Sequence, residues 1–182
     1  MGERRFALFG LVGPLVAFLF IALSIGLSPW FNWQDNALSD LGHATDSSVA
    51  PLFNFGLFFA GFLVMVYSVM VLRTHARYTG FCLLVSSLLL QLVAVFDEVY
   101  GSLHFLVSVL LFVSFGFASL AYGFEKRSAL ALAAFAIGFC SWAFYLAGVY
   151  GEGVAVPETI SSVAVVSWVA SSALKALRLE RK

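Results

Sequence analysis

Two short segments hold most of the side chains in this chain that could do chemistry. The first, Ser39-Asp40-Leu41-Gly42-His43, places a hydroxyl, a carboxylate and an imidazole within five residues. If the segment is helical, Ser39 and His43 lie one turn apart on one face, where they could share a ligand or act as nucleophile and base. The same residues also suit a plain turn that Asp40 caps and Gly42 ends. The pattern leaves both interpretations open.

The second segment joins two apolar runs. Asp97 and Glu98 end one run, and His104 begins the next after five intervening residues. Because the turn is short, we expect Asp97 to lie near His104, where a carboxylate fixes an imidazole tautomer for proton transfer or metal binding. The alternative is that both acids are solvated and His104 is an interfacial residue.

These groups define two candidate chemistries. His43, His104 and Asp97, joined by Asp40 or Glu158, would suit a divalent metal such as zinc, which accepts nitrogen and oxygen ligands together. Without a metal, a histidine could activate a hydroxyl or a water. The candidate catalytic residues are Ser39, Asp40, His43, Asp97 and His104. No HExxH, GxSxG, P-loop or dinucleotide motif is present to favour one chemistry.

Four further polar residues are candidates for a ligand pocket. Glu158 follows Pro157 at the start of the last apolar run, where a carboxylate also complements the positive end of a helix dipole. Asn54 and Gln91 are amides inside apolar runs, so each needs a partner on another helix or on a ligand. The predicted pocket residues are Asn54, Gln91, Glu98 and Glu158.

Six apolar segments must position these side chains. Of the 182 residues 62% are hydrophobic and 11% are charged, whereas about a quarter of the residues of soluble domains are charged. Each segment is near the length of about 20 residues that spans a membrane. The expected helices are 6–27, 51–72, 78–96, 103–124, 129–149 and 154–174, with a long loop over 28–50. The sequence predicts an all-α protein, a single domain built as a bundle of six transmembrane helices.

Charge along the chain predicts the orientation of this bundle. All ten Lys and Arg residues fall into four clusters, at residues 4–5, 73–77, 126–127 and 175–182, and the loops between alternate spans carry acids and no Lys or Arg. Basic loops stay in the cytoplasm, so both termini are predicted inside and the acidic loops outside the plasma membrane. His43 and His104 then share the outer side, and His75 does not. Such dispersed bases also exclude nucleic acid as a partner.

Three stretches carry a family resemblance: Asn36 to Gly42, Leu52 to Gly56 with Gly61, and Val95 to Glu98 with Gly101 to His104. Together they resemble the prokaryotic six-helix membrane family catalogued as domain of unknown function 998. The resemblance implies the six-helix bundle and supplies no activity. A looser analogy links Ser39-x3-His43, Asp97 and His104 to the zinc-dependent membrane hydrolases of the alkaline ceramidase and adiponectin-receptor type. Those proteins have seven helices and a late His-x3-His element, which this chain lacks.

The leading functional prediction is an outward-facing polar pocket for a lipid headgroup or a small amphiphile. If the protein is an enzyme, the expected reaction is hydrolysis with metal-bound or His-activated water. A non-catalytic assembly subunit is the alternative, favoured by stripes of small residues and by the lack of a signature motif. A transporter is less favoured because the helix centres carry no ionisable residue. Membrane lipids are the expected partners, and a homo-oligomer stays open.

Overall fold

The computed structural model describes residues 2–179 and consists of helices joined by loops. The six long helices are α2 (Phe9–Gly26), α3 (Ala50–Tyr67), α5 (Arg77–Val95), α6 (Ser102–Glu125), α7 (Ala129–Leu146) and α8 (Ala155–Leu179). Short α1 (Gly2–Ala7) precedes α2, while a π-helical turn η2 (Ser68–Leu72) and α4 (Arg73–His75) prolong α3. Two 3-10 turns, η1 (Ser39–Gly42) and η3 (Glu98–Tyr100), lie in the loops. The described residues contain no strand, so the all-α prediction is confirmed.

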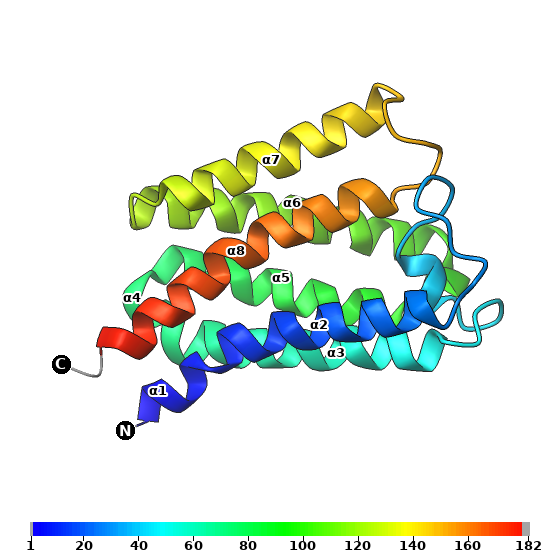
Figure 1. Ribbon diagram of the computed structural model, residues 1–182. Helices are drawn as coiled ribbons and strands as arrows, with labels where there is room; N and C mark the ends of the chain where they lie inside the picture. The colour runs from blue at the N-terminus through cyan, green and yellow to red at the C-terminus, as the bar shows by residue number, and fades with distance from the viewer. Residues whose placement is uncertain (1, 180–182) are drawn as a thin grey trace.

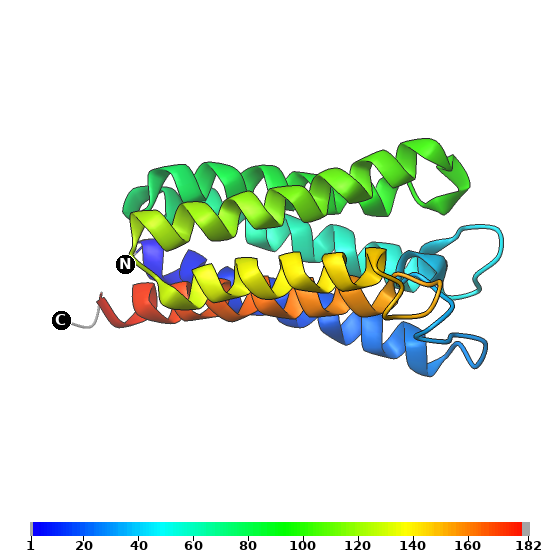
Figure 2. The same ribbon diagram turned by 90° about the horizontal axis from the view of Figure 1, so that it is seen from above.

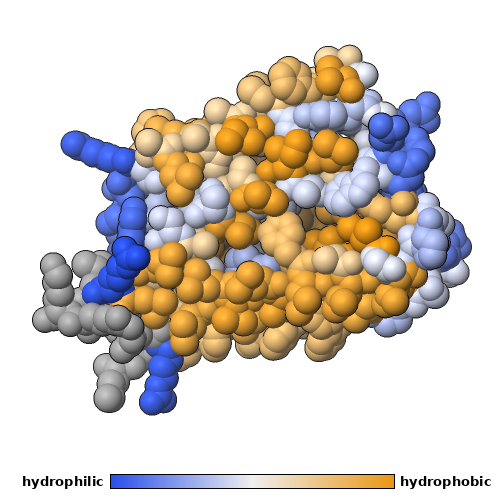
Figure 3. Space-filling view, viewed as in Figure 1, coloured by the Kyte–Doolittle hydropathy of each residue, from blue (hydrophilic) through white to orange (hydrophobic). Residues whose placement is uncertain are grey.

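Six helices within residues 2–179 are long and apolar enough to cross a membrane. Their number and positions match the predicted spans to within a few residues, apart from the break at Leu8 between α1 and α2. An apolar surface band covers the middle of the bundle, and hydrophilic residues gather at its two ends (Figure 3). The chain is therefore a multi-pass membrane protein.

The helices pack in chain order and close into a ring. Each long helix contacts the next one along the chain, and α8 also contacts α2. Seen from above, α5 and α6 run along one side of the bundle, and α7, α8 and α2 run along the other (Figure 2). Apart from α2 and α3, which residues 27–49 join, this order follows from short connections, since antiparallel helices joined by short loops become neighbours.

Glycines allow the helices of the ring to approach closely. A Cβ atom on Gly13 of α2 would lie 2.8 Å from Val64 and 3.2 Å from the backbone oxygen of Ala60, both on α3. One on Gly61 would lie 2.9 Å from the backbone oxygen of Ser87 on α5. Small residues at these positions bring the backbones together where lipid offers no hydrophobic driving force.

The two ends of the bundle differ in charge. The loop of residues 27–49, here called the long loop, joins the turns at 96–101 and 147–154 at one end, called the acidic end, where the sequence holds no Lys or Arg. The other, basic end holds α1, α4 and the last turn of α8 (Figure 1). Of the last basic cluster, Arg181 and Lys182 lie outside the described residues.

A carboxylate organises the basic end. Glu125, the last residue of α6, accepts hydrogen bonds from the backbone N–H groups of Tyr78 (3.0 Å) and Thr79 (2.7 Å). The Thr79 hydroxyl donates to the same side chain at 2.5 Å. Glu125 therefore caps the start of α5 from a neighbouring helix, since the first N–H groups of a helix have no partner within it.

Candidate functional site

The long loop is held against the bundle by two leucines. Leu38 and Leu41 are only 8% and 0% exposed, and they pack with apolar residues of α3 and with Ala155 at the start of α8. Asp40 points the other way and accepts hydrogen bonds from the Ala37 backbone N–H (3.0 Å) and from Asn36 Nδ2 (2.7 Å). This segment, which suited either a helix or a plain turn, thus forms the 3-10 turn η1.

Backbone hydrogen bonds join the long loop to the segment before α8. Gly153 N–H donates to Gln34 O at 2.8 Å, and Ala155 N–H donates to Asn36 O at 3.0 Å. A Cβ atom on Gly153 would collide with the backbone of Asn36, so glycine permits this approach. The two acidic-end loops consequently form one connected layer.

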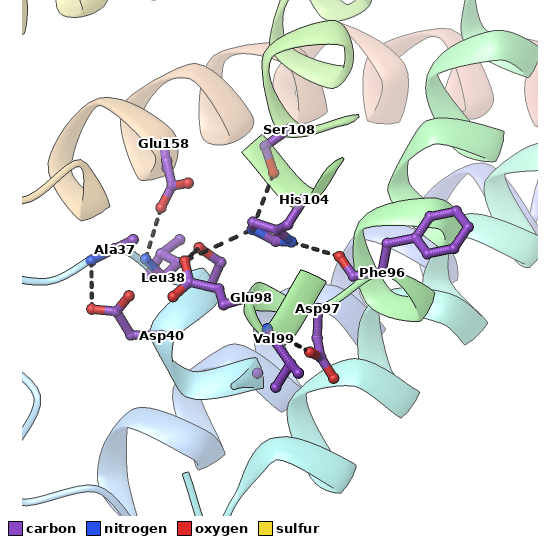
Figure 4. A network of polar contacts seen from close by, with 12 residues as sticks. Ala37, Leu38, Asp40, Phe96, Asp97, Glu98, Val99, His104, Ser108 and Glu158 are labelled. Atoms are coloured by element: carbon purple, nitrogen blue, oxygen red, sulfur yellow. Dashed lines mark hydrogen bonds and ion pairs between the residues drawn. The ribbon is translucent and has the colours of Figure 1, made fainter. Parts of the chain in front are cut away.

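The Glu158 side chain adds a hydrogen bond to this layer. Its Oε2 accepts a hydrogen bond of 2.7 Å from the backbone N–H of Leu38, and the residue is 7% exposed (Figure 4). It lies in the first turn of α8, where the helix dipole favours a negative charge. Glu158 therefore anchors the long loop while it remains at the wall of the cavity described below.

His104 is oriented by a backbone carbonyl. Its Nδ1 lies 2.7 Å from Phe96 O, and its Nε2 lies 3.2 Å from the Ser108 hydroxyl and 3.8 Å from Glu98 Oε1 (Figure 4). A carbonyl can only accept, so Nδ1 must donate, which assigns the tautomer. The imidazole is 7% exposed, and thus its Nε2 atom faces an interior cluster of Ser108 and Glu98.

Glu98 links the long loop to His104. The Ser39 hydroxyl donates a hydrogen bond of 2.6 Å to Glu98 Oε1, the atom nearest His104. Burial raises the pKa of Glu98, the Ser39 hydrogen bond lowers it, and the nearby Asp40 raises it again. Two carboxylates close together at an end without Lys or Arg resist simultaneous ionisation.

Two candidate partners of His104 make other contacts. Asp97 was expected near His104, and its Oδ1 accepts a hydrogen bond of 2.9 Å from Val99 N–H and so caps η3. His43 would share the Ser39 face only in an α-helix. It ends the 3-10 turn instead, with its Nδ1 3.2 Å from Thr45 Oγ1 and 3.6 Å from Asp46. A 3-10 helix has three residues per turn, so residues i and i+4 do not share a face.

The zinc prediction finds no support in this geometry. Within residues 2–179, no group of three or more His, Cys, Asp or Glu side chains is arranged to hold a metal ion. His43 pairs with Asp46 in the long loop, while His104 pairs with Glu98 and Ser108. A zinc site of His43, His104 and Asp97 therefore stays a prediction from the sequence.

The two amides make structural hydrogen bonds. Asn54 Nδ2, near the start of α3, donates to Gly42 O in the long loop at 2.8 Å. Gln91 Nε2 donates to Ser87 O one turn earlier on its own helix at 3.2 Å. Asn54 thus also holds the long loop against α3, and the Gln91 side-chain N–H group finds its hydrogen-bond acceptor within α5.

A cavity of about 120 Å³ runs inside the ring below the long loop. Its walls come from α2, α3, α5, α6 and α8, and most of the lining is apolar, including Phe53, Leu57 and Leu90. Small residues such as Pro14, Ala17 and Ala60 leave the space open. Its polar lining is formed by Ser39, Ser86, Ser87, Ser108, Glu158 and Ser162. The cavity therefore joins an apolar interior to hydroxyl and carboxyl groups under the long loop.

Comparison with known proteins identifies the family. The family described as "Protein of unknown function (DUF998)" matches residues 11–175, which include nearly all of the six spans. The chain belongs to the DUF998 family. No curated protein and no solved structure matches it. The description of DUF998 assigns no activity, so a function must be argued from the site itself.

In this DUF998 protein, sequence reasoning missed the carboxylate nearest to His104. Glu98 has that place, while Asp97 caps a turn. The preference of Asp for the position before a helical turn was a usable signal. Nothing in the sequence pointed to the Phe96 carbonyl, because any residue carries that group.

Proposed function

We propose that the protein binds a single-chain amphiphile, with its alkyl chain in the cavity and its polar group beneath the long loop. The observation that supports this most is the composition of the cavity wall. Apolar residues from five helices surround the space, and Ser39, Ser108 and Glu158 line it where η1 and the first turn of α8 meet α6. Mainly apolar pockets with a few convergent polar groups are typical of small-molecule sites.

The cavity volume favours one chain over two. An engineered cavity of about 150 Å³ binds benzene, so about 120 Å³ accommodates a segment of one alkyl chain. A recess on the apolar face between α2 and α8 offers a route from the membrane (Figure 3). A lipid with two chains would leave one chain outside, in that recess.

The charge of the acidic end determines which polar group of an amphiphile can bind there. The carboxyl groups of Glu98 and Asp40 lie near each other, and Glu158 contacts the same long loop. The three loops at this end hold no Lys or Arg, whereas proteins bind phosphate and carboxylate groups mainly through such residues. An uncharged or cationic amphiphile therefore fits this site, and an anionic one does not.

The distribution of basic residues supports access from the outer leaflet. Basic loops remain in the cytoplasm, and all ten Lys and Arg residues flank the opposite end of the spans. In the proposed orientation, the long loop covers the cavity from the extracytoplasmic side of the plasma membrane. The ligand would enter laterally, with its polar group at headgroup depth.

Photo-crosslinking of the protein in nanodiscs tests this proposal. The probe is a dodecyl glycerol ether with a diazirine in its chain, competed by dodecyl chains that carry glycerol, trimethylammonium or phosphate. We expect cross-links to residues of the cavity wall, and competition by the first two compounds only. Cross-links confined to lipid-facing residues, or equal competition by dodecyl phosphate, would contradict the proposal.

A matched pair of variants on α5 separates the cavity from the membrane surface. Leu90 lines the cavity, whereas Leu88, two residues earlier, is exposed on the outside of the bundle. Leu90→Trp fills part of the space and should weaken cross-linking by about tenfold, since about two excluded methylenes are each worth about 0.8 kcal/mol. Leu88→Trp introduces the same side chain outside the cavity and should leave cross-linking unchanged.

A further inference from the structure

The Ser108 hydroxyl faces the lone pair of a histidine. Because His104 Nδ1 donates to Phe96 O at 2.7 Å, the neutral ring has its free lone pair on Nε2. The Ser108 hydroxyl lies 3.2 Å from this atom and can donate to it (Figure 4). A hydroxyl, a base and a group that orients the base form the arrangement that activates serine nucleophiles.

The two residues differ in their access to the cavity. Ser108 lies one helical turn after His104 on α6, and it lines the cavity, whereas His104 is buried behind it. The hydroxyl is thus presented to the bound chain, and the base is shielded from bulk water. Ser39, which the sequence offered as a candidate nucleophile, donates its hydroxyl to Glu98 at 2.6 Å, so that proton does not go to a histidine.

The carboxyl group of Glu98 lies beside this base. Its Oε1 lies 3.8 Å from His104 Nε2, on the side where the imidazole gains a proton when the serine reacts. An opposite charge within about 4 Å stabilises the protonated ring. The ring is therefore oriented by Phe96 O through Nδ1 and stabilised by Glu98 near Nε2.

We infer that Ser108 and His104 hydrolyse long-chain carboxylic esters with an uncharged alcohol group, an inference that rests on the proposed amphiphile site. Ser108 Oγ forms a bond to the ester carbonyl carbon while its proton passes to His104 Nε2. The bond from the carbonyl carbon to the alcohol oxygen breaks, and the alcohol leaves with that proton. A water molecule then attacks the acyl-serine through the same base, which releases the carboxylic acid and restores the Ser108 hydroxyl.

Labelling with a dodecyl fluorophosphonate tests the nucleophile directly. The reagent reacts with activated serines, and mass spectrometry of the purified protein in nanodiscs locates the label. We expect the label on Ser108, and His104→Gln should slow labelling by at least about 100-fold, the usual contribution of a general base. Ser114→Ala is the matched control, because Ser114 is on the same helix but hydrogen-bonds to Ser86 and Leu111 O.

A cysteine substitution gives a second readout that does not depend on loss of function. In Ser108→Cys the thiol would face His104, which lowers the pKa of a neighbouring thiol. Alkylation at residue 108 by iodoacetamide should then stay fast well below the ordinary thiol pKa. The double variant with His104→Gln should lose this reactivity at low pH, an effect that a purely structural role for His104 would not produce.

The outcomes separate this inference from the proposed binding function. A label on Ser39, or no label together with normal photo-crosslinking in the cavity, would overturn the hydrolytic inference and leave amphiphile binding intact. Absence of both label and cavity cross-links would overturn both. Ser108 labelling in wild type that survives His104→Gln would also refute the role assigned to the base.

Discussion

Removal of the Glu158 carboxylate should release the long loop. In Glu158→Ala the backbone N–H of Leu38 loses the acceptor that lies 2.7 Å away, although it stays buried. A buried donor without a partner costs about 1–3 kcal/mol. The two backbone hydrogen bonds from Gly153 and Ala155 persist, so we expect more frequent opening of the loop rather than detachment. The same free energy corresponds to about 5–150-fold in the opening equilibrium.

Hydrogen exchange of the protein in nanodiscs measures this effect. When the loop recloses faster than it exchanges, the exchange rate of residues 34–43 follows the opening equilibrium. Glu158→Gln keeps an oxygen acceptor for the Leu38 N–H, but the amide must be turned so that its oxygen and not its NH₂ group faces that donor. Its exchange should therefore lie between wild type and Glu158→Ala. Glu152→Ala is the control, since Glu152 is an exposed acid of the neighbouring turn.

Two results would refute this reasoning. Unchanged exchange of residues 34–43 in Glu158→Ala would mean that the carboxylate does not hold the loop. Equal acceleration in Glu158→Gln and Glu158→Ala would mean that charge, and not the acceptor atom, carries the effect.

Three further predictions concern the packing and the ends of the bundle. Gly61→Val should lower the Tm, because a Cβ atom at residue 61 lies 2.9 Å from a backbone oxygen of α5 and would push α3 away from α5. The expected cost is about 1–3 kcal/mol. Gly26→Ala is the control and should leave the Tm unchanged, since no atom lies within 4 Å of a Cβ at residue 26. Glu125→Ala should lower the Tm through loss of a helix cap worth about 1 kcal/mol. Burial raises the pKa of Glu98, so its contribution to stability is complete below the ordinary glutamate pKa and is lost as pH rises through the folded-state value. The Tm should therefore fall over that pH range, and Glu98→Gln should flatten the fall.

Each of these predictions has a contrary outcome. An unchanged Tm for Gly61→Val would show that α3 and α5 can separate at no cost. Thr79→Val removes one of the three donors to Glu125, and it should produce only part of the Glu125→Ala loss. A fall in Tm with pH that persists in Glu98→Gln would assign the titration to another group.

Local pattern predicted some contacts at the acidic end and failed for others. The segment around Ser39 was compatible with a helix or with a plain turn, and it forms the 3-10 turn η1 with Leu41 buried. In a 3-10 turn His43 does not share a face with Ser39, as it would in an α-helix. Two adjacent acids, Asp97 and Glu98, could have faced His104. The backbone of Asp97 decided between them, because this residue has an extended ψ of -178° and precedes the first residue of η3. The capping preference of Asp favours this conformation, whereas the distance from Glu98 to His104 depends on how α5 and α6 pack.

The sequence alone determined the six spans, the all-α class and the division into an acidic and a basic end. Hydropathy over about 20 residues and charge beside each span are properties of contiguous segments, so they need no knowledge of packing. Only the tertiary structure decided that Ser108, Glu98 and the Phe96 carbonyl surround His104, and that a cavity opens beneath them. These features depend on the distances between helices. Adding or removing a single methyl group at a helix contact is enough to change such a distance.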